Sequence, residues 1–252
     1  MKPTFLNAKK PLLTVIIQAA TPERVEYLTK ASLQNGADAF GLQICRLNKQ
    51  YQNGKDISAL FSLMENKPIY ITNYRHSENT GKTDTELAKE MVSYASFGAT
   101  LCDVMGDMFG ISDDQTTTDP LAVAKQKEYI KELHKNGAEV LMSSHMQKFI
   151  DKERLLEIAL QMEDRGADIA KIVTFANTKE EQIKNLEATL YLKEKLSIPF
   201  LFLSNGHCEL IRRVGPVIGS CMYLCVYEHD EYSTPDQPLL TQARAVRESF
   251  NW

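Results

Sequence analysis

A lysine and a histidine lie on two neighbouring apolar segments in an arrangement that suits proton-transfer chemistry. Residues 139–144 form an apolar run that ends at His145, and Lys171 lies inside the next run, 168–174. Burial among apolar side chains disfavours the ammonium form and lowers the pKa of a lysine. A neutral amine can attack a ketone to form a Schiff base, which then serves as an electron sink. A nearby histidine can remove an α-proton and return it to a departing hydroxyl.

Both residues also have ordinary structural explanations. Lys171 could extend its amine to solvent, or it could pair with Asp168 or Asp103. His145 could be a hydrogen-bonded structural histidine at the end of a strand. On the pattern alone, these explanations stand beside the catalytic one.

Four Gly-Ala pairs, at 36–37, 98–99, 137–138 and 166–167, indicate how the chain positions these residues. Each pair follows a helical pattern and precedes an apolar run. A glycine just past a helix end supplies a left-handed cap, and the run behind it is then a strand. The predicted strands are Leu13–Gln18, Ala39–Cys45, Pro68–Asn73, Thr100–Met105, Glu139–Ser144, Ile169–Thr174, Pro199–Ser204 and Val217–Val226. The predicted helices are Pro22–Gln34, Asp56–Glu65, Asp84–Ser96, Asp119–Asn136, Lys152–Arg165, Lys179–Leu196, Glu209–Val214 and Pro238–Ser249.

The predicted strands are near-continuous apolar runs, which is typical of a parallel sheet covered on both faces. Eight strand-then-helix units in 252 residues predict a single-domain (β/α)8 TIM barrel over residues 1–252. Catalytic groups in such barrels lie at the carboxyl ends of the strands, where the polar segments 74–85 and 110–119 fall. A doubly wound open sheet is the structural alternative. The sequence contains neither Gly-x-Gly-x-x-Gly nor a Walker A loop, which weakens a nucleotide-binding version of it.

The composition is ordinary for a soluble globular protein. Hydrophobic residues make up 43% of the chain, charged residues 25%, and the net charge is −4. A mildly acidic chain is a poor match for nucleic acid or an anionic membrane surface, and no apolar run approaches the ~20 residues of a membrane span. The five cysteines form no CxxC pair, and Cys221 and Cys225 are expected to be buried, so we predict a reducing, cytoplasmic setting.

The segment that carries His145 and Lys171 resembles one known family. Met142-Ser-Ser-His145, then the helix at 155–162, then Arg165-Gly-Ala-Asp-Ile-Ala-Lys171-Ile-Val is similar to type I 3-dehydroquinate dehydratase. That family has Ser-x-His at the end of one strand and Gly-Ala-Asp-Ile-x-Lys on the next. The resemblance implies a (β/α)8 barrel, a Schiff-base lysine at Lys171 and a general acid/base histidine at His145. It also implies the dehydration of 3-dehydroquinate in the shikimate pathway, a cytoplasmic homodimer, and chemistry without a metal or organic cofactor.

The resemblance further implies a set of substrate-binding residues. The family's carboxylate-binding arginine falls on Arg213, with its neighbour Arg212 as the alternative; a guanidinium fork suits a planar carboxylate. The family's Ser-Ala-Pro-Gly-Gln lid matches residues 233–237, so Ser233 and Gln237 are expected to contact the substrate from a closing loop. The loop arginine after the third strand matches Arg75.

The sequence departs from the family on the side of the site that holds the ring hydroxyls. Gly41-Leu42-Gln43 replaces the family's Glu-x-Arg, and the serine of strand one corresponds to Ile16. Cys45 replaces an acid, His207 replaces a lysine, and the fourth strand keeps one acid, Asp103. Losing groups that hydrogen-bond a hydroxyl costs several kcal/mol in transition-state binding. We therefore expect the reaction class to be retained, while the natural substrate could differ.

Four hypotheses about function follow. The leading hypothesis is an imine-forming lyase that acts on 3-dehydroquinate, with Gln43, Gln18 or His207 supplying the replacement hydrogen bonds. The second applies the same imine chemistry to a related carboxylated hydroxy-ketone, by dehydration or retro-aldol cleavage. The third is a non-catalytic barrel that binds a carboxylate, which would have no need of a desolvated amine beside a base. A metal-dependent aldolase is a weaker choice, because His134, His145 and His207 lack the spacing of a ligand cluster.

Overall fold

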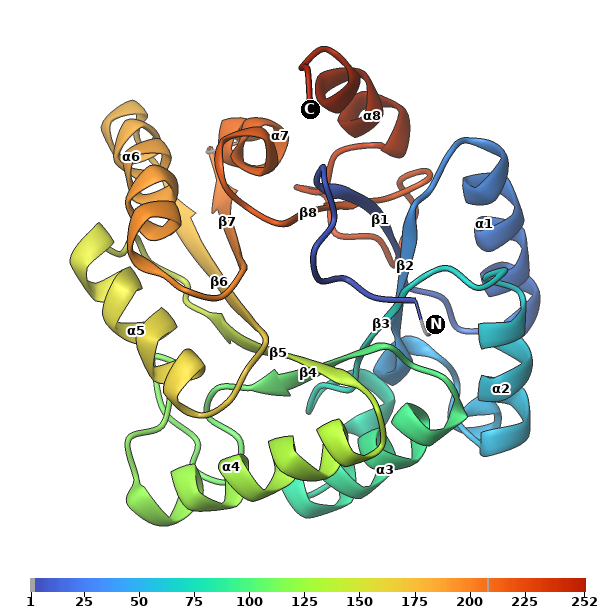
Figure 1. The fold of residues 1–252 in the computed structure, drawn as a ribbon. Coiled ribbons are helices and arrows are strands. Elements are labelled where there is room, and N and C mark those ends of the chain that lie inside the picture. Colours follow the sequence, from blue (N-terminus) through green and yellow to red (C-terminus); the bar gives the residue numbers. More distant parts are fainter. Residues whose placement is uncertain (1–2, 208) are drawn as a thin grey trace.

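The computed structural model describes residues 3–207 and 209–252 and has eight parallel strands surrounded by helices (Figure 1). The strands are β1 Leu12–Ile17, β2 Ala39–Gln43, β3 Ile69–Thr72, β4 Leu101–Met105, β5 Glu139–His145, β6 Ile169–Ala176, β7 Phe200–Gly206 and β8 Met222–Cys225. The helices are α1 Pro22–Gln34, α2 Gly54–Ser62, α3 Asp84–Phe97, α4 Pro120–Lys135, α5 Lys152–Asp164, α6 Lys179–Lys195, α7 Glu209–Ile218 and α8 Leu240–Glu248. Three short 3-10 helices, η1 Ile44–Arg46, η2 Lys49–Tyr51 and η3 Ser77–Asn79, lie in the loops after β2 and β3.

The sheet runs in the order β7-β6-β5-β4-β3-β2-β1-β8, and each neighbouring pair is parallel. The two outer strands approach each other where the N–H of Cys221, just before β8, donates to the carbonyl of Phe200 at 2.9 Å. This is the predicted (β/α)8 barrel, nearly closed. The alternative of a doubly wound open sheet is wrong, because β8 returns to pair with β1.

The helix boundaries follow the capping signals in the sequence. Thr21 and Asp119 accept hydrogen bonds from the backbone N–H groups of Arg24 and Ala122, and a proline follows each cap. The glycines of all four Gly-Ala pairs have positive φ, between 77° and 126°, and each ends a helix before a strand. Local capping chemistry therefore fixes where each helix gives way to a strand.

The prediction that the last strand covers residues 217–226 is wrong about where the strand begins. Helix α7 continues to Ile218, and β8 covers Met222–Cys225 alone. Val217 packs against the core from the helix, and the N–H groups of Gly219 and Ser220 donate to the carbonyl of Gly215. A short apolar run fits a buried helix as well as a buried strand, so periodicity could not separate the two.

The hydrophobic core has two layers. The larger layer lies between the strands and the surrounding helices, and the smaller one fills the inside of the barrel. Phe5, in the segment before β1, belongs to the inner layer and meets the ring of Tyr70 edge-on with a centroid distance of 6.5 Å. The inner layer is thus a packed core, as in other barrels of eight strands, and the open end is left to the polar groups at the strand ends.

In the part of the chain that the structure describes, no helix is both long and apolar enough to span a membrane. Within the same residues, no three His, Cys, Asp or Glu side chains come together as they would around a metal ion. Three of the cysteines, Cys45, Cys102 and Cys225, are buried, whereas Cys221 is partly exposed, and Cys208 lies outside the described residues.

One ion pair at the amino-terminal end of the strands predicts a pH-dependent stability. His134 Nε2 lies 2.8 Å from Asp168 Oδ2, and this hydrogen bond raises the pKa of His134 against the opposing effect of burial. A raised pKa stabilises the fold below the pKa of the unfolded histidine, and the benefit is lost as pH rises through the folded-state pKa. We expect His134→Gln to lower the free energy of unfolding at about pH 5.5 and to change it little at about pH 9. Urea denaturation at both pH values measures this, and an equal loss at both would contradict it.

Candidate active site

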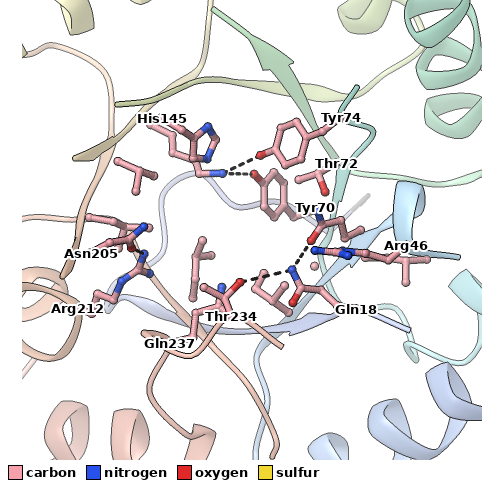
Figure 2. Close-up of a pocket in the computed structure, with 18 of the residues that line it drawn as sticks. Gln18, Arg46, Tyr70, Thr72, Tyr74, His145, Asn205, Arg212, Thr234 and Gln237 are labelled. Carbon is pink, nitrogen blue, oxygen red and sulfur yellow. Dashed lines mark hydrogen bonds between the residues drawn. The ribbon is translucent and has the colours of Figure 1, made fainter. Parts of the chain in front are cut away.

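A cavity of about 270 Å³ opens at the carboxyl ends of the strands (Figure 2). Its polar lining comes from seven strands or the loops that follow them and from one helix: Gln18, Gln43, Arg46, Tyr70, Thr72, Tyr74, His76, His145, Lys171, Asn205, Arg212, Thr234 and Gln237. Its apolar lining is Ile16, Gly41, Leu42, Val173, Leu203 and Leu224. The structure therefore brings the predicted Lys171 and His145 into one pocket on the face where barrels place their sites.

Lys171 projects from β6 into this pocket and is 4% exposed. Its Nζ lies 3.0 Å from the hydroxyl oxygens of both Tyr70 and Tyr74, and 3.3 Å from Asp103 Oδ2. Burial lowers the pKa of Lys171, and the carboxylate of Asp103 opposes that effect. The expected lowering of the pKa of Lys171 is therefore confirmed, and so is the alternative that Lys171 pairs with Asp103. The alternative that it pairs with Asp168 is wrong, because that carboxylate binds His134.

Asp103, on β4, is the acceptor around which the lysine and its neighbours are arranged. It receives hydrogen bonds from the hydroxyls of Tyr70, Tyr74 at 2.8 Å and Ser143 at 2.5 Å, and its side chain is fully enclosed. Burial, followed by the charge of Asp103, raises the pKa of both tyrosines well above the ordinary value. Both phenols are thus protonated donors at neutral pH, and they satisfy the carboxylate without neutralising the amine.

His145 ends β5, the strand beside Lys171, with Ser143 in register with the lysine. Its ring meets the ring of Tyr74 edge-on with a centroid distance of 5.6 Å. Burial, followed by the positive charge of Lys171, lowers the pKa of His145 to about 3. The imidazole is therefore neutral at physiological pH and able to accept a proton.

The arginine that reaches the pocket is Arg212, whereas Arg213 is absent from the described lining residues. Arg212 is 5% exposed, and its guanidinium is held by the carbonyl of Ser204 at 3.0 Å and by the side-chain oxygen of Asn205. The sequence assigned the carboxylate contact to Arg213 with Arg212 as the alternative; the geometry favours the alternative. Adjacent residues of α7 point about 100° apart, so only one of two neighbours can face the site.

The segment after β8 contributes Gln237 as predicted, but Thr234 in place of Ser233. The hydroxyl and the backbone N–H of Ser233 both bond to Asp230, so this serine closes its own turn. Gln237 is buried, and its side-chain oxygen has no hydrogen-bond partner among the described residues. An unsatisfied buried acceptor of this kind marks a place for a substrate hydroxyl or a water.

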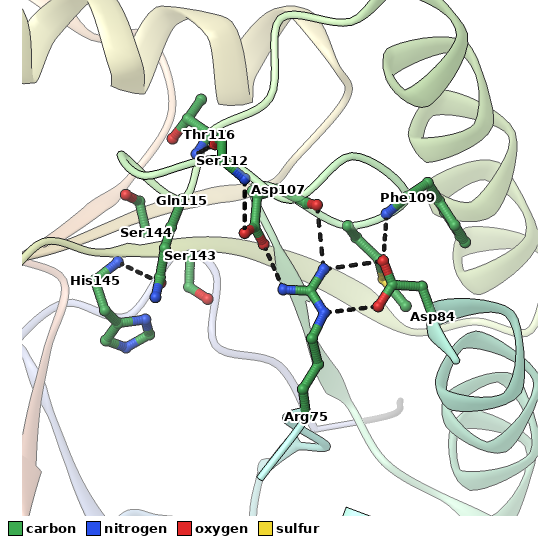
Figure 3. A network of polar contacts seen from close by, with 12 residues as sticks. Arg75, Asp84, Asp107, Phe109, Ser112, Gln115, Thr116, Ser143, Ser144 and His145 are labelled. Atoms are coloured by element: carbon green, nitrogen blue, oxygen red, sulfur yellow. Dashed lines mark hydrogen bonds and ion pairs between the residues drawn. The ribbon is translucent and has the colours of Figure 1, made fainter. Parts of the chain in front are cut away.

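Arg75, which the resemblance expected to contact the substrate, is absent from the described lining of the pocket. Its guanidinium binds Asp84 through two nitrogens at 2.7 and 2.9 Å, Asp107 at 2.8 Å, and the carbonyl of Asp107 at 3.1 Å (Figure 3). Burial raises the pKa of Asp84, but the bonds from Arg75 and the N–H of Phe109 outweigh it and hold that pKa below its usual value. Arg75 joins the loop after β3 to α3 and to the loop after β4.

The side of the pocket that departs from the family is filled by two bulky side chains. A Cβ added at Gly41 would lie 2.3 Å from Ile16 Cδ1 and 3.2 Å from Tyr70 Cδ1. The glycine therefore makes room for Ile16 and for the tyrosine that contacts Lys171. Beside it, Gln18 donates to the side-chain oxygen of Gln43, so an amide pair occupies the ends of β1 and β2.

His207, the third residue considered as a replacement, is exposed and is absent from the described lining of the pocket. The residues that sequence reasoning missed are Tyr70, Tyr74, Arg46, Asn205 and Thr234. Tyr70 lies inside an apolar strand, where a tyrosine ordinarily indicates core packing. The available signal was that a buried tyrosine needs a partner for its hydroxyl, and Lys171 and Asp103 were the polar residues on nearby strands.

Replacement of Arg75 by alanine should destabilise the protein, because it leaves the nearly enclosed Asp107 and the half-buried Asp84 without their counter-charge. Removing one partner of a buried pair costs about 3 kcal/mol. We expect the free energy of unfolding of Arg75→Ala to fall by about that amount in chemical denaturation. If Arg75 contacted substrate instead, the variant would keep its stability and lose ligand affinity.

The fold and the pocket define a (β/α)8 barrel with a buried, charge-paired lysine at the carboxyl ends of its strands. The chain belongs to the type I 3-dehydroquinase family, whose profile matches residues 13–251.

Curated relatives agree with this assignment, and a solved structure agrees with the fold. The chain is 40% identical over 90 residues to a 3-dehydroquinate dehydratase of Alkaliphilus oremlandii, covering 34% of this chain and 35% of the relative. It is 27% identical over 213 residues to a catabolic 3-dehydroquinate dehydratase of Acinetobacter baylyi, covering 81% of this chain and 74% of the relative. The crystal structure of a 3-dehydroquinate dehydratase from Geobacillus kaustophilus superposes with a TM-score of 0.81 at 18% identity, covering 96% and 91% of the two chains. The matches to the most similar curated relatives span roughly a third to three fifths of those relatives' length, 35% to 60%.

Proposed function

We propose that the protein is a Schiff-base-forming lyase that converts 3-dehydroquinate into 3-dehydroshikimate and water. The observation that carries the proposal is Lys171, a buried amine with a lowered pKa that opens onto a pocket beside a neutral histidine. Family membership and the printed names of the relatives support the same substrate. The chemistry needs no cofactor, because the imine itself withdraws electrons from the neighbouring carbon.

In the proposed mechanism, Arg212 binds the substrate carboxylate and places the ketone carbon beside Lys171. The unprotonated amine attacks that carbon, and the carbonyl oxygen leaves as water when the imine forms. His145, neutral at physiological pH, removes a proton from the carbon next to the imine. The electrons expel the hydroxyl at the β-carbon, and the imidazolium of His145 gives its proton to that hydroxyl, which leaves as water. Hydrolysis of the product imine restores Lys171.

Three unsatisfied acceptors support a polyhydroxylated substrate. The side-chain oxygens of Gln18, Gln237 and Thr72 are buried and have no hydrogen-bond partner among the described residues. All three residues line the pocket. Buried acceptors of this kind are ordinarily paired, so substrate hydroxyls would complete them. We infer that the side-chain amides of Gln18 and Gln237 bind the substrate hydroxyls in place of the family's acidic residue. This role was expected for Gln18.

The same chemistry on a different carboxylated hydroxy-ketone is the second candidate. Ile16 and Tyr70 occupy the space above Gly41, which narrows the side of the pocket meant for ring hydroxyls. The imine would then assist dehydration if the bond from the α-carbon to hydrogen lies perpendicular to the plane of the imine, or retro-aldol cleavage if the bond from the α-carbon to the β-carbon does. A barrel that only binds carboxylates is disfavoured, because it would gain nothing from a desolvated amine beside a base. The proposal also includes the cytoplasmic homodimer and the shikimate-pathway role that the family resemblance implies.

Borohydride trapping tests the proposed function. Incubation with 3-dehydroquinate and sodium borohydride should add the reduced substrate to Lys171, detectable by mass spectrometry, while the unreduced sample gains the absorbance of 3-dehydroshikimate. Lys171→Met should abolish both signals, because it removes the amine and fills the same space with an apolar chain. Lys179→Ala, at an exposed position on α6, is the matched lysine control and should retain both. An adduct without turnover would favour the second candidate, and no adduct with any ketone would refute imine chemistry.

The pH profile of imine formation should report Lys171 and not His145. The amine must lose its proton to react, so the trapping rate should rise with pH through a pKa below the ordinary lysine value of about 10.4. His145, with a pKa of about 3, should add no inflection near neutrality. Asp103→Asn removes the charge that raises the pKa of Lys171, so it should shift the profile to lower pH. Initial rates of borohydride-trapped adduct across pH measure both, and a shift to higher pH in this variant would contradict the assigned role of Asp103.

A further inference from the structure

A second arginine faces the pocket from the side opposite Arg212. Arg46 ends the short helix η1 after β2, and Figure 2 shows it across the pocket from Arg212. Its Nε is buried and has no hydrogen-bond partner, and no ion pair joins its guanidinium to a carboxylate in the described part of the chain. A buried polar group without a partner is rare and calls for an explanation, most directly a ligand.

The charges around the pocket leave Arg46 uncompensated. The described lining contains three cations, Lys171, Arg46 and Arg212, and no aspartate or glutamate. Asp103 lies beneath the lining and is committed to Lys171. By contrast, Arg75 is paired with Asp84 and Asp107, and the guanidinium of Arg212 is held by oxygens of Ser204 and Asn205. Burial and the charge of Arg46 together lower the pKa of His76, which agrees with an unbalanced positive charge at this end of the pocket.

We propose that the pocket takes, beside 3-dehydroquinate, a second class of substrate: ketones that carry a carboxylate at each end. Arg212 binds one carboxylate, Arg46 binds the other, and Lys171 reaches the carbonyl between them. The inference rests on the proposed imine chemistry. It goes beyond that function because a substrate with one carboxylate leaves Arg46 without a counter-charge.

The surroundings of Arg46 favour a carboxylate over a phosphate. A single guanidinium presents a fork that matches one carboxylate, whereas a phosphate carries more charge and ordinarily gathers further cations or a row of backbone N–H groups. The side chains nearest that end of the pocket include the amide pair Gln18 and Gln43, which carries no charge. A cavity of about 270 Å³ has room for a short dicarboxylate.

The covalent step is the same as for 3-dehydroquinate. The nitrogen of Lys171 forms a C=N bond to the ketone carbon as the C=O bond breaks, and the oxygen leaves as water with the two protons of the amine. Borohydride then delivers hydride to the imine carbon, the nitrogen takes a proton from water, and the ligand is fixed to the lysine as a secondary amine.

Two ketones that differ in one carboxylate test the proposal. The probes are 4-oxoheptanedioate, with a carboxylate at each end, and 4-oxopentanoate, with one. Neither carries a β-hydroxyl, so trapping reports binding and imine formation apart from dehydration. For the native protein, we expect half-maximal adduct at a concentration about tenfold lower for the dicarboxylate, as one charge-assisted contact provides. Arg46→Gln should abolish this preference, and Arg46→Lys should restore part of it.

Matched controls separate this role from a structural one. Lys49→Gln removes the same charge three residues further on, at an exposed position outside the described lining, and should keep the preference. Because Arg46 has no partner to lose, Arg46→Gln should keep the native melting temperature, which a structural arginine would not allow. Equal trapping of the two ketones by native protein, or an unchanged preference in Arg46→Gln, would overturn the proposal.

A binding measurement without a ketone distinguishes failure of the proposed function from failure of this inference. Calorimetry with heptanedioate and hexanoate measures how much the second carboxylate adds to the binding affinity. Neither acid has a ketone, so neither can form an imine. Tighter binding of heptanedioate that depends on Arg46 supports the two-carboxylate site even if no adduct forms, and the missing adduct then counts against the imine chemistry alone. Equal binding of the two acids by native protein counts against the two-carboxylate site, whatever the trapping shows.

Discussion

The buried contact between Lys171 and Asp103 is the interaction on which the rest of the site depends. An isolated ammonium or carboxylate at this depth would cost several kcal/mol to desolvate, so each requires the other together with full hydrogen bonding. Tyr70, Tyr74 and Ser143 complete the bonds of the carboxylate. Because these donors are neutral, they leave the amine as the one cation in contact with Asp103. The balance between burial and this carboxylate sets how readily the lysine loses its proton.

On the side of the pocket formed by β1, β2 and β3, one glycine decides which side chains line the site. Gly41 allows Ile16 and Tyr70 to close over β2, and the tyrosine that enters this space also reaches the lysine. The space beside Gly41 is therefore lined by the same tyrosine whose hydroxyl accepts a hydrogen bond from Lys171. Without an acid in the described lining, the pocket is cationic, with arginines at two sides. The pocket thus carries more positive charge than a single carboxylate would balance.

Ion pairs and hydrogen bonds connect the loops at the strand ends. Arg75 connects three segments around β3 and β4 through two carboxylates, although a substrate contact was the expectation from the sequence. An arginine in a loop of the catalytic face can serve either purpose, and only the positions of Asp84 and Asp107 decide which. The same reasoning applies to Ser233, whose hydroxyl closes a turn on Asp230 while its neighbour Thr234 faces the pocket.

The sequence by itself determined the eight strand-and-helix units, because capping residues and glycines with positive φ act locally. It also singled out His145, at the end of one apolar run, and Lys171, inside the next run. It could not determine which residue of the pair Arg212 and Arg213 faces the pocket, since that depends on the rotation of α7 against the barrel. Nor could it bring Tyr70 to the lysine, because the two residues are far apart in the chain and meet only when the barrel closes around its interior. Local chemistry fixes where elements begin and end, whereas the contacts that tune a buried charge come from packing between distant segments.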